Sequence, residues 1–394
     1  MGEEARSQAC GSEGVFIFYE AAGIPAESCL LADSREEGLA FPKGDLTLGF
    51  CDQCGFIQNT RFDSRIQQQT SQYEDSQAAS PTFGSFAREV AAGLIERHRI
   101  KDKHVIEIGC GQGEFLALIC ELGGNSGIGI DPLASGDRVG SAAGATVSFI
   151  PENFSESHGR LPFQLICCRH TLEHIRPVKQ FLDTVRRAIG ARDDVVVFFE
   201  VPDVGRILRE TAFWDIYYEH CSYFSMGSLA RLFRSSEFEI IDLKKGFGDQ
   251  YLLIEARPGV GPGDEGRGDE ETPEELSGLV EAFSGEVVAA LDGWRKRFNQ
   301  YARDGGATTL WGSGSKAVAF ISSLGLTEEV NVVVDIDPRK QGRFLPGTGH
   351  EIVGPEYLTR FPPNRIVVMN PVYLDEIGTE VDSLGIKVDL IPAC

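Results

Sequence analysis

The chain has 394 residues, 42% of them hydrophobic, which predicts two or three domains with sizeable cores. Its formal net charge of −22 argues against nucleic acid or an anionic membrane surface as a partner, because like charges repel. The polar N-terminus lacks the basic flank and apolar run of a signal peptide, and no apolar run approaches membrane-spanning length. We therefore expect a cytoplasmic protein, a monomer or small homo-oligomer, that acts on a small molecule.

Residues 1–70 predict a small β-rich docking module. It contains Cys51-x-x-Cys54 followed by glycine, the form of half a zinc knuckle. A structural zinc site needs four ligands, usually two such pairs, and the remaining Cys10 and Cys29 are isolated in the sequence. We therefore expect no metal in this module. Four other cysteines fall in apolar patterns and are expected to be buried, reduced thiols: Cys110, Cys120, Cys167 and Cys168.

Residues 71–256 predict a doubly wound α/β unit that binds a cofactor. Helical spacing over residues 83–98 precedes a buried strand and the turn Glu107-x-Gly109-x-Gly111-x-Gly113. Glycines let the backbone turn tightly and approach a ligand closely. This pattern does not meet the dinucleotide fingerprint. It resembles motif I of class I S-adenosylmethionine-dependent methyltransferases, and the resemblance extends the expected contacts to Phe115.

The next predicted strand ends at Asp131, where folds of this kind grip ribose hydroxyls, with Pro132 directly after it. A carboxylate there can accept two hydrogen bonds from a diol. Asn153 and Phe154 follow another short strand and are expected to face the adenine.

Two later predicted strands carry polar residues at their carboxyl ends, where ligands bind in open α/β sheets. Arg169 and His170 follow the first and are expected at the cofactor, although a structural role for His170 is equally open. His174 is expected on the same helical face as His170 and nearer the substrate. Glu200 ends the second strand and is expected to contact substrate.

The stretch from Ile216 to Ser225 gathers three phenols, a carboxylate and an imidazole within ten residues. His220 has the side chain whose ordinary pKa lies nearest neutrality, which suits a proton-abstracting base. Glu219 or a nearby tyrosine such as Tyr217 would orient or stabilise it. A Glu-His pair with aromatic neighbours also occurs in packed structure, so the context decides between these interpretations.

Residues 257–304 predict an acidic linker and a long helix, and residues 305–394 a second α/β unit. Its turn, Gly312 to Ala317, meets a loose dinucleotide pattern together with Asp335, so an NAD site stays open. Lys316 in that turn would equally hold a diphosphate. A basic turn further on offers three cations that either bind substrate phosphate or form a solvated loop: Arg339, Lys340 and Arg343.

As a set, these motifs resemble the sugar C-methyltransferase family, whose members methylate C3 of nucleotide-linked 4-keto-6-deoxysugars. The resemblance covers nearly the whole chain. It rests on the cysteine pair, the motif I glycines, the residues 169–174 and 217–225, and the turns 312–316 and 340–347. The family usually carries a second cysteine pair upstream, where this chain has Cys10 alone.

The resemblance implies the cofactor S-adenosylmethionine and His220 as the base. It also implies that Tyr217 and Glu219 line the sugar site, with Tyr73 and His174 nearby. The C-terminal unit would then seat a nucleotide-sugar, and Tyr217 or His174 would stabilise the enolate oxygen. Three alternatives stay open from the residues alone: an O-methyltransferase, a non-catalytic nucleotide-sugar-binding protein, and an NAD-dependent oxidoreductase.

Overall fold

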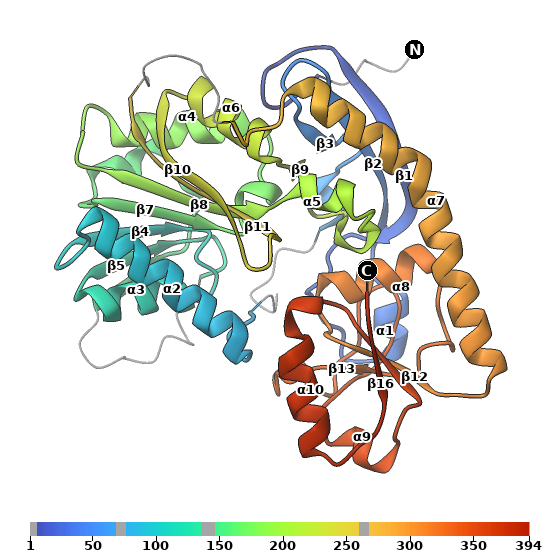
Figure 1. Cartoon of the computed structure of the whole chain (residues 1–394). Coiled ribbons are helices and arrows are strands. Elements are labelled where there is room, and N and C mark those ends of the chain that lie inside the picture. The colour runs from blue at the N-terminus through green and yellow to red at the C-terminus, as the bar shows by residue number, and fades with distance from the viewer. Residues whose placement is uncertain (1–5, 68–75, 135–145, 260–267, 394) are drawn as a thin grey trace.

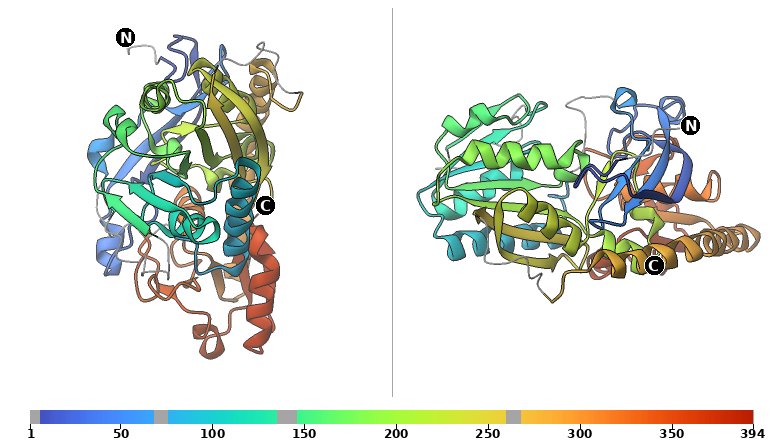
Figure 2. Two further views of the ribbon diagram at one scale, coloured as in Figure 1. Left: turned by 90° about the vertical axis from the view of Figure 1, so that its left-hand side faces the viewer. Right: turned by 90° about the horizontal axis from the view of Figure 1, so that it is seen from above.

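The computed structural model describes residues 6–67, 76–134, 146–259 and 268–393. Within these ranges the chain forms a small antiparallel sheet, a seven-stranded sheet and a five-stranded parallel sheet (Figure 1). The long helix α7 (Pro273–Arg303) packs against strands of the small sheet and against helix α8 (Ser315–Leu324) of the C-terminal part. Two further views show this helix running along one side of the molecule (Figure 2). The helix therefore ties the two ends of the chain together.

The small sheet combines two distant parts of the chain. Its order is β1-β2-β3-β9, with antiparallel neighbours, and a short helix α1 (Arg35–Leu39) follows β1. The strand β9 belongs to the tyrosine- and histidine-rich stretch, so its pairing with β3 attaches that stretch to the N-terminal module. The strands are β1 (Val15–Pro25), β2 (Lys43–Cys51), β3 (Ile57–Asn59) and β9 (Ser222–Tyr223).

The middle sheet has the doubly wound arrangement of a class I methyltransferase, with strand order β10-β11-β8-β7-β4-β5-β6. All neighbours are parallel except that β11 is antiparallel to β8 and β10. The chain order reverses at β4, and ligands bind beyond the carboxyl ends of strands at such a point. The strands are β4 (His104–Ile108), β5 (Ser126–Ile130), β6 (Thr146–Ile150), β7 (Leu165–Arg169), β8 (Val196–Pro202), β10 (Phe238–Gly246) and β11 (Tyr251–Pro258).

Helices cover both faces of this sheet, because successive strand residues point to opposite sides. Val105 packs with the helices α2 and α3 in one core, whereas Ile106 packs with α4 and α6 in another. Ser80 begins α2 by accepting a hydrogen bond from Phe83 N, the usual serine N-cap. The helices are α2 (Pro81–His98), α3 (Glu114–Gly123), α4 (Val178–Ile189), α5 (Val204–Arg209) and α6 (Met226–Ser235).

The C-terminal sheet is wholly parallel, in the order β14-β13-β12-β15-β16. Helix α8 begins directly after the glycine turn that follows β12. The other elements are β12 (Thr308–Trp311), β13 (Val333–Val334), β14 (Ile352–Val353), α9 (Tyr357–Arg360), β15 (Arg365–Val368), α10 (Leu374–Ser383) and β16 (Asp389–Pro392). The predicted fold class, a methyltransferase-type α/β sheet with a second Rossmann-like unit, is confirmed.

An aromatic cluster fixes the C-terminal unit against the middle of the chain. Phe320 on α8 stacks on Phe213, with ring centroids 5.8 Å apart, and meets Trp294 of α7 edge-on at 5.1 Å. Phe213 belongs to the 3₁₀ turn η4 (Phe213–Asp215), which leads into the tyrosine- and histidine-rich stretch. Phe320 is fully buried, so the cluster locks the position of α8 relative to that stretch.

We expect Phe320→Ala to lower the free energy of unfolding by about 3–5 kcal/mol, because it removes a buried ring from a packed core. Phe361 is 61% exposed, and Phe361→Ala should change stability by less than about 0.5 kcal/mol. Denaturant titration followed by tryptophan fluorescence measures both changes. Equal effects of the two substitutions would contradict the importance of this cluster.

Candidate active site

A cavity of about 280 Å³ lies between the middle sheet and the C-terminal unit. His170, His174 and His220 line it from the methyltransferase side. Lys316 and Lys340 line it from the C-terminal side. The cavity therefore joins groups that can exchange protons with groups that carry positive charge.

His220 lies deep in this cavity and is only 7% exposed. The ring of His174 lies perpendicular to it with centroids 4.8 Å apart, and the ring of Tyr217 lies 4.7 Å away. Burial, together with the positive charges of His174 and His170, holds the pKa of His220 well below its usual range. The imidazole is therefore neutral near pH 7, with a lone pair available to accept a proton.

One buried carboxylate connects the two sides of the cavity. Asp215 accepts a hydrogen bond from the hydroxyl of Tyr217 at 2.7 Å and forms ion pairs with Arg206 and Lys316. Although burial alone would raise it, the charges of Lys316 and Arg206 hold the pKa of Asp215 below its ordinary value. Asp215 and Arg206 are missing from the sequence-based site. The sequence signal that could have identified Asp215 was its position two residues before Tyr217. No periodic pattern marks Asp215 or Arg206.

Glu219 and Glu173 both neighbour a histidine in sequence, but only Glu173 lines the cavity. Glu219 accepts a hydrogen bond from the backbone N–H of Ser28 at 3.1 Å, and it is not among the residues that line the cavity. Glu173 lines the cavity, and its buried Oε2 atom has no hydrogen-bond partner. The expected placement of Glu219 at the sugar therefore needs correction, since its carboxylate holds the N-terminal module. Glu173 was missed although it lies in the motif that contains His174.

The prediction that His170 and His174 share one helical face is also wrong. His170 has a left-handed backbone (φ 49°), and the 3₁₀ turn η3 (Leu172–His174) begins only after it, so the two residues do not share a helical face. His170 Nε2 lies 2.8 Å from Glu200. Burial alone would lower the pKa of His170, but hydrogen bonds with Glu173 and Glu200 raise it to about 9.

Glu200 is fully buried and is engaged by Arg169, whose Nη2 lies 2.9 Å away. Burial would raise the pKa of Glu200, but the Arg169 charge and the bond to His170 lower it to about 2. The Arg169 guanidinium lies over the ring of Phe115, 4.2 Å from its centroid. The expected substrate contact of Glu200 is corrected: this carboxylate holds Arg169 and His170 in place.

The glycine turn after β4 fits a closely bound ligand. Its three glycines have positive φ angles of 65°, 50° and 80°. A Cβ added at Gly111 would meet open space, whereas one at Gly109 would collide with a side chain. Asp131 accepts a hydrogen bond from Gly111 N at 3.1 Å, and the Oε2 atom of buried Glu107 has no partner. A buried carboxyl with one unpartnered oxygen beside an open turn suits the cationic methionine end of S-adenosylmethionine. The glycines are Gly109, Gly111 and Gly113.

The remaining residues expected at the cofactor lie at the edge of this region. Pro132 and Asn153 are exposed. Phe154 is half-buried and stacks on His158, with centroids 5.3 Å apart. Tyr73, expected near the substrate, lies outside the described residues.

The three cations of the basic turn differ in position. Lys340 lines the cavity, with Nζ 3.8 Å from Asp335. Arg339 pairs with Asp337 at 2.6 Å. Arg343 donates to backbone carbonyls of the N-terminal module, which include Leu31 O at 2.8 Å. Neither arginine lines the cavity, so their expected phosphate contacts are corrected: both brace loops.

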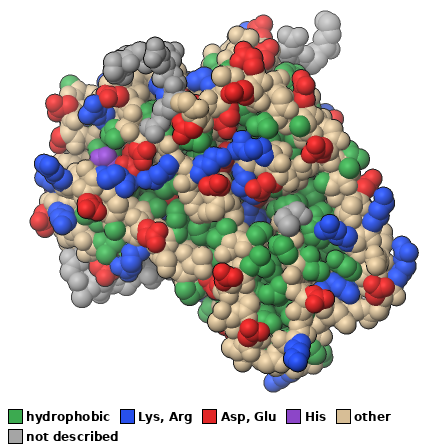
Figure 3. Space-filling view, viewed as in Figure 1, with side chains coloured by type: hydrophobic (Ala, Val, Ile, Leu, Met, Phe, Trp, Pro, Cys, Tyr) green, Lys and Arg blue, Asp and Glu red, His purple; other side chains and the backbone are tan. Residues whose placement is uncertain are grey.

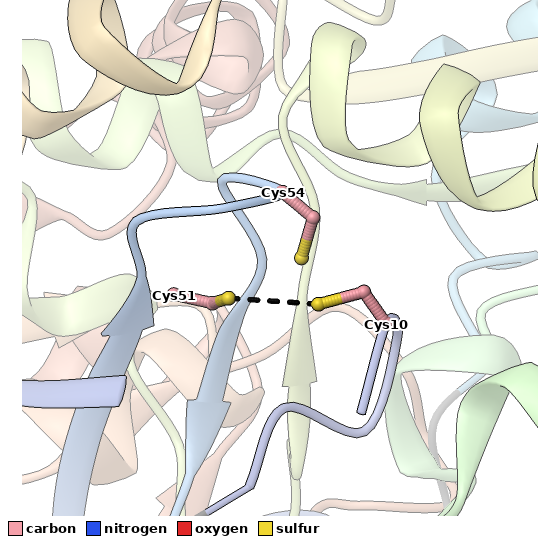
Figure 4. A group of neighbouring side chains, drawn as sticks. All are labelled: Cys10, Cys51 and Cys54. Carbon is pink, nitrogen blue, oxygen red and sulfur yellow. Dashed lines mark hydrogen bonds between the residues drawn. The ribbon is translucent and has the colours of Figure 1, made fainter. Parts of the chain in front are cut away.

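Three thiols converge in the N-terminal module (Figure 4). The sulfurs of Cys10, Cys51 and Cys54 all lie within 4.8 Å of one another, and Ser7 Oγ is 3.5 Å from Cys54 Sγ. Cys10, which is isolated in the sequence, therefore joins the Cys51 and Cys54 pair in space, whereas Cys29 lies elsewhere, beside Ser315. These residues could supply three of the four ligands of a structural zinc ion. The absence of a metal stays a prediction.

The surface carries charges of both signs. On the face in Figure 3, Lys and Arg side chains are interspersed with Asp and Glu. Among the described residues, no helix combines the length and apolar composition needed to cross a membrane.

Comparison with known protein families identifies two segments. Residues 83–243 match the family described as methyltransferase domain, and residues 270–385 match the C-methyltransferase C-terminal domain. The chain is an S-adenosylmethionine-dependent C-methyltransferase. The predicted resemblance is thereby confirmed, as is the predicted cofactor.

The C-methyltransferase NovU of Streptomyces niveus is similar to this C-methyltransferase, with 26% identity over 74% of this chain and 72% of that protein. Among solved structures, 1,6-didemethyltoxoflavin-N1-methyltransferase of Burkholderia thailandensis has 17% identity and a TM-score of 0.35, covering 45% of this chain and 81% of its own. Magnesium protoporphyrin IX methyltransferase of Synechocystis PCC 6803 has 12% identity and a TM-score of 0.34, with coverages of 45% and 80%.

Proton release on cofactor binding tests the role of Glu107. Burial raises the pKa of Glu107 to about 8, so the free enzyme holds it protonated at pH 7. A cation bound beside it favours the carboxylate, so binding of S-adenosylmethionine should release up to about one proton, and affinity should rise between pH 6 and about 8. Calorimetry in buffers of different ionisation enthalpy measures this release.

Glu107→Gln is the matched control, because the amide keeps the shape of the side chain and cannot titrate. We expect weaker binding and no Glu107-linked proton release in this variant. Identical proton release in both proteins would contradict the assignment.

Proposed function

We propose that this C-methyltransferase transfers a methyl group to a carbon next to a ketone, and that its substrate is a nucleotide-linked 4-keto-deoxysugar methylated at C3. The cavity carries this proposal, because it combines a neutral imidazole at His220 with the cations Lys316 and Arg206. An imidazole suits removal of a C–H proton beside a carbonyl. The cations suit the anionic diphosphate of an activated sugar.

His220 takes the proton from the carbon, and the electron pair of the broken C–H bond moves into an enolate. S-adenosylmethionine supplies an electrophilic methyl group on a sulfonium. The enolate carbon takes this methyl group: the new C–C bond forms as the carbon–sulfur bond breaks, and the electron pair of the broken bond stays on sulfur in the departing thioether. The proton on His220 passes to solvent to complete the cycle. The protein therefore contributes orientation, proton removal and stabilisation of the enolate oxygen.

His174 is the better donor for that oxygen. The hydroxyl proton of Tyr217 is committed to Asp215, so Tyr217 can approach the oxygen only after that bond is broken. His174 lines the cavity next to His220, with its ring perpendicular to the base and the ring centroids 4.8 Å apart. A substrate carbonyl that reaches this pair of imidazoles would meet a base and a hydrogen-bond donor side by side.

Cationic side chains that line the cavity support an anionic substrate. Arg206 and Lys316 both line this cavity, in a chain with a net charge of −22. Asp215 pairs with both cations and Glu210 pairs with Arg206, so an anionic substrate would compete with these carboxylates for the two cations. Lys316 also lies in the first turn of α8, where backbone N–H groups favour anions.

The geometry argues against an NAD site in the C-terminal unit. Asp335 would have to bind ribose hydroxyls there. Its carboxylate instead accepts hydrogen bonds from the N–H and hydroxyl of Ser313, at 3.0 and 2.5 Å, and from Asp337 N at 2.9 Å. These bonds brace the glycine turn, and with Lys340 Nζ 3.8 Å away they leave the carboxylate few acceptor sites for a ribose diol. C-methylation, which the C-terminal family match supports, also disfavours an O-methyltransferase.

A screen of nucleotide-activated keto-sugars with isotopically labelled methyl donor tests the substrate class by mass. We expect a labelled product whose NMR spectrum shows a new C-methyl group and no methoxy signal. Cofactor binding without product from any keto-sugar would favour the non-catalytic alternative.

We expect His220→Gln to lower methyl transfer by about 10²–10⁴-fold, the usual effect of losing a general base. The same variant should lose exchange of the substrate C–H with D₂O, measured by NMR without the methyl donor. His104→Gln is the control, since His104 is exposed at the other end of β4. Full exchange in His220→Gln would assign the base to another residue.

Lys316→Met should raise KM for the keto-sugar by about 10- to 100-fold, the free energy of a hydrogen bond to a charged group, with less effect on kcat. Asp215→Asn should instead lower kcat by about tenfold without raising KM, because it frees the cations but removes the negative charge that favours a protonated His220. Arg343→Met, away from the cavity, is the control. Steady-state kinetics on folded variants would contradict this division if Lys316→Met changed only kcat.

A further inference from the structure

A carboxylate and two imidazoles converge inside the cavity, whose lining does not include the glycines of the turn that fits the cofactor. Glu173, His174 and His220 each offer one ligand atom, and these atoms all lie within 4.8 Å of one another. The three residues come from two separate segments, the η3 turn after β7 and the stretch before β9. They all line the cavity, so a small solute that reaches the substrate site also reaches them.

The carboxylate of this group has spare capacity. Glu173 is 1% exposed, and its Oε2 atom forms no hydrogen bond. An unsatisfied buried carboxylate oxygen is costly, and a bound cation would relieve that cost. His170 lies 3.8 Å from the other oxygen, which leaves Oε2 as the free ligand atom.

We propose that Glu173, His174 and His220 form a binding site for a divalent transition-metal ion such as Zn²⁺ or Co²⁺, and that this ion inhibits the enzyme. Two imidazole nitrogens and one carboxylate oxygen form a ligand set that such ions prefer over Mg²⁺ or Ca²⁺. Three protein ligands leave coordination positions open for water or for a substrate oxygen.

Inhibition follows from the shared lone pair. The nitrogen of His220 that binds the ion is then unable to accept a proton from the substrate, and the ion occupies the space between His220 and His174. This consequence rests on the proposed base, whereas metal binding itself does not. Chelation of the ion restores the free imidazole, so the inhibition is reversible.

The thiol group at Cys10, Cys51 and Cys54 is a second place where such an ion could bind, and its ligands differ in kind. Thiolates give cobalt an intense ultraviolet charge-transfer band, whereas imidazole and carboxylate give only weak visible bands. Cobalt spectra therefore report the two locations separately. Both can be followed in the full-length protein.

The binding test is a titration of the reduced, full-length enzyme with Co²⁺. We expect a visible spectrum that develops without the thiolate band and that weakens with added Zn²⁺. Glu173→Gln and His174→Gln should each reduce this affinity by at least about 10- to 100-fold. Glu219→Gln and His104→Gln are matched controls, because neither side chain lies in the cavity, and both should retain it.

Retained cofactor binding by each variant shows that it is folded. An unchanged visible spectrum in both Glu173→Gln and His174→Gln, or cobalt bound only through thiolates, would overturn the site. Because this test needs no sugar, it stands even if no keto-sugar proves to be a substrate.

The inhibition test uses whichever keto-sugar the screen identifies. Zn²⁺ should stop both methyl transfer and C–H exchange in D₂O, and a chelator should restore both. His174→Gln should need at least about tenfold more Zn²⁺ for half-inhibition, relative to its own uninhibited rate. Stimulation by Zn²⁺, or inhibition unchanged in His174→Gln, would overturn the inhibitory role.

Discussion

The candidate site depends on one buried carboxylate that three groups share. Asp215 receives a hydrogen bond from Tyr217 and ion pairs from Arg206 and Lys316, so it links the catalytic stretch to the C-terminal unit. Burying such charges is costly, and the arrangement is stable only because each partner is present. The aromatic cluster around Phe320, one helical turn after Lys316, supports the same contact through packing. Packing therefore sets the distance between the units, and Asp215 sets how their polar groups align.

This arrangement also explains how the base can be both buried and available. Burial keeps His220 neutral, which preserves its lone pair but makes it a weak base in the free enzyme. An anionic substrate that engages Lys316 would weaken the ion pair between Lys316 and Asp215. The negative charge of Asp215 would then act more strongly on His220, whose protonated form it favours. Substrate binding at Lys316 would thus strengthen the base at His220.

Local sequence was sufficient for the parts of the site that lie within one element. The strand-turn-helix around Gly109 to Gly113 and the acid at Asp131 follow from strand endings and glycine conformations, which are local properties. Contacts between distant segments were not predictable in this way. Asp215 and Lys316 are 101 positions apart, and Cys10 reaches Cys51 across 41. No periodicity reports such pairs, because tertiary packing brings them together.

The direction in which a loop side chain points could not be predicted from the sequence either. Glu219 and His220 are neighbours in sequence, yet Glu219 points to the backbone of Ser28 whereas His220 points into the cavity. The carboxylate near the base is therefore Glu173, from a segment about fifty residues earlier. Lone pairs that converge on one point are what proton abstraction and enolate stabilisation require, and the same convergence forms a set of metal ligands. A site that places two imidazoles beside a buried carboxylate is therefore exposed to capture by a transition-metal ion until substrate fills it.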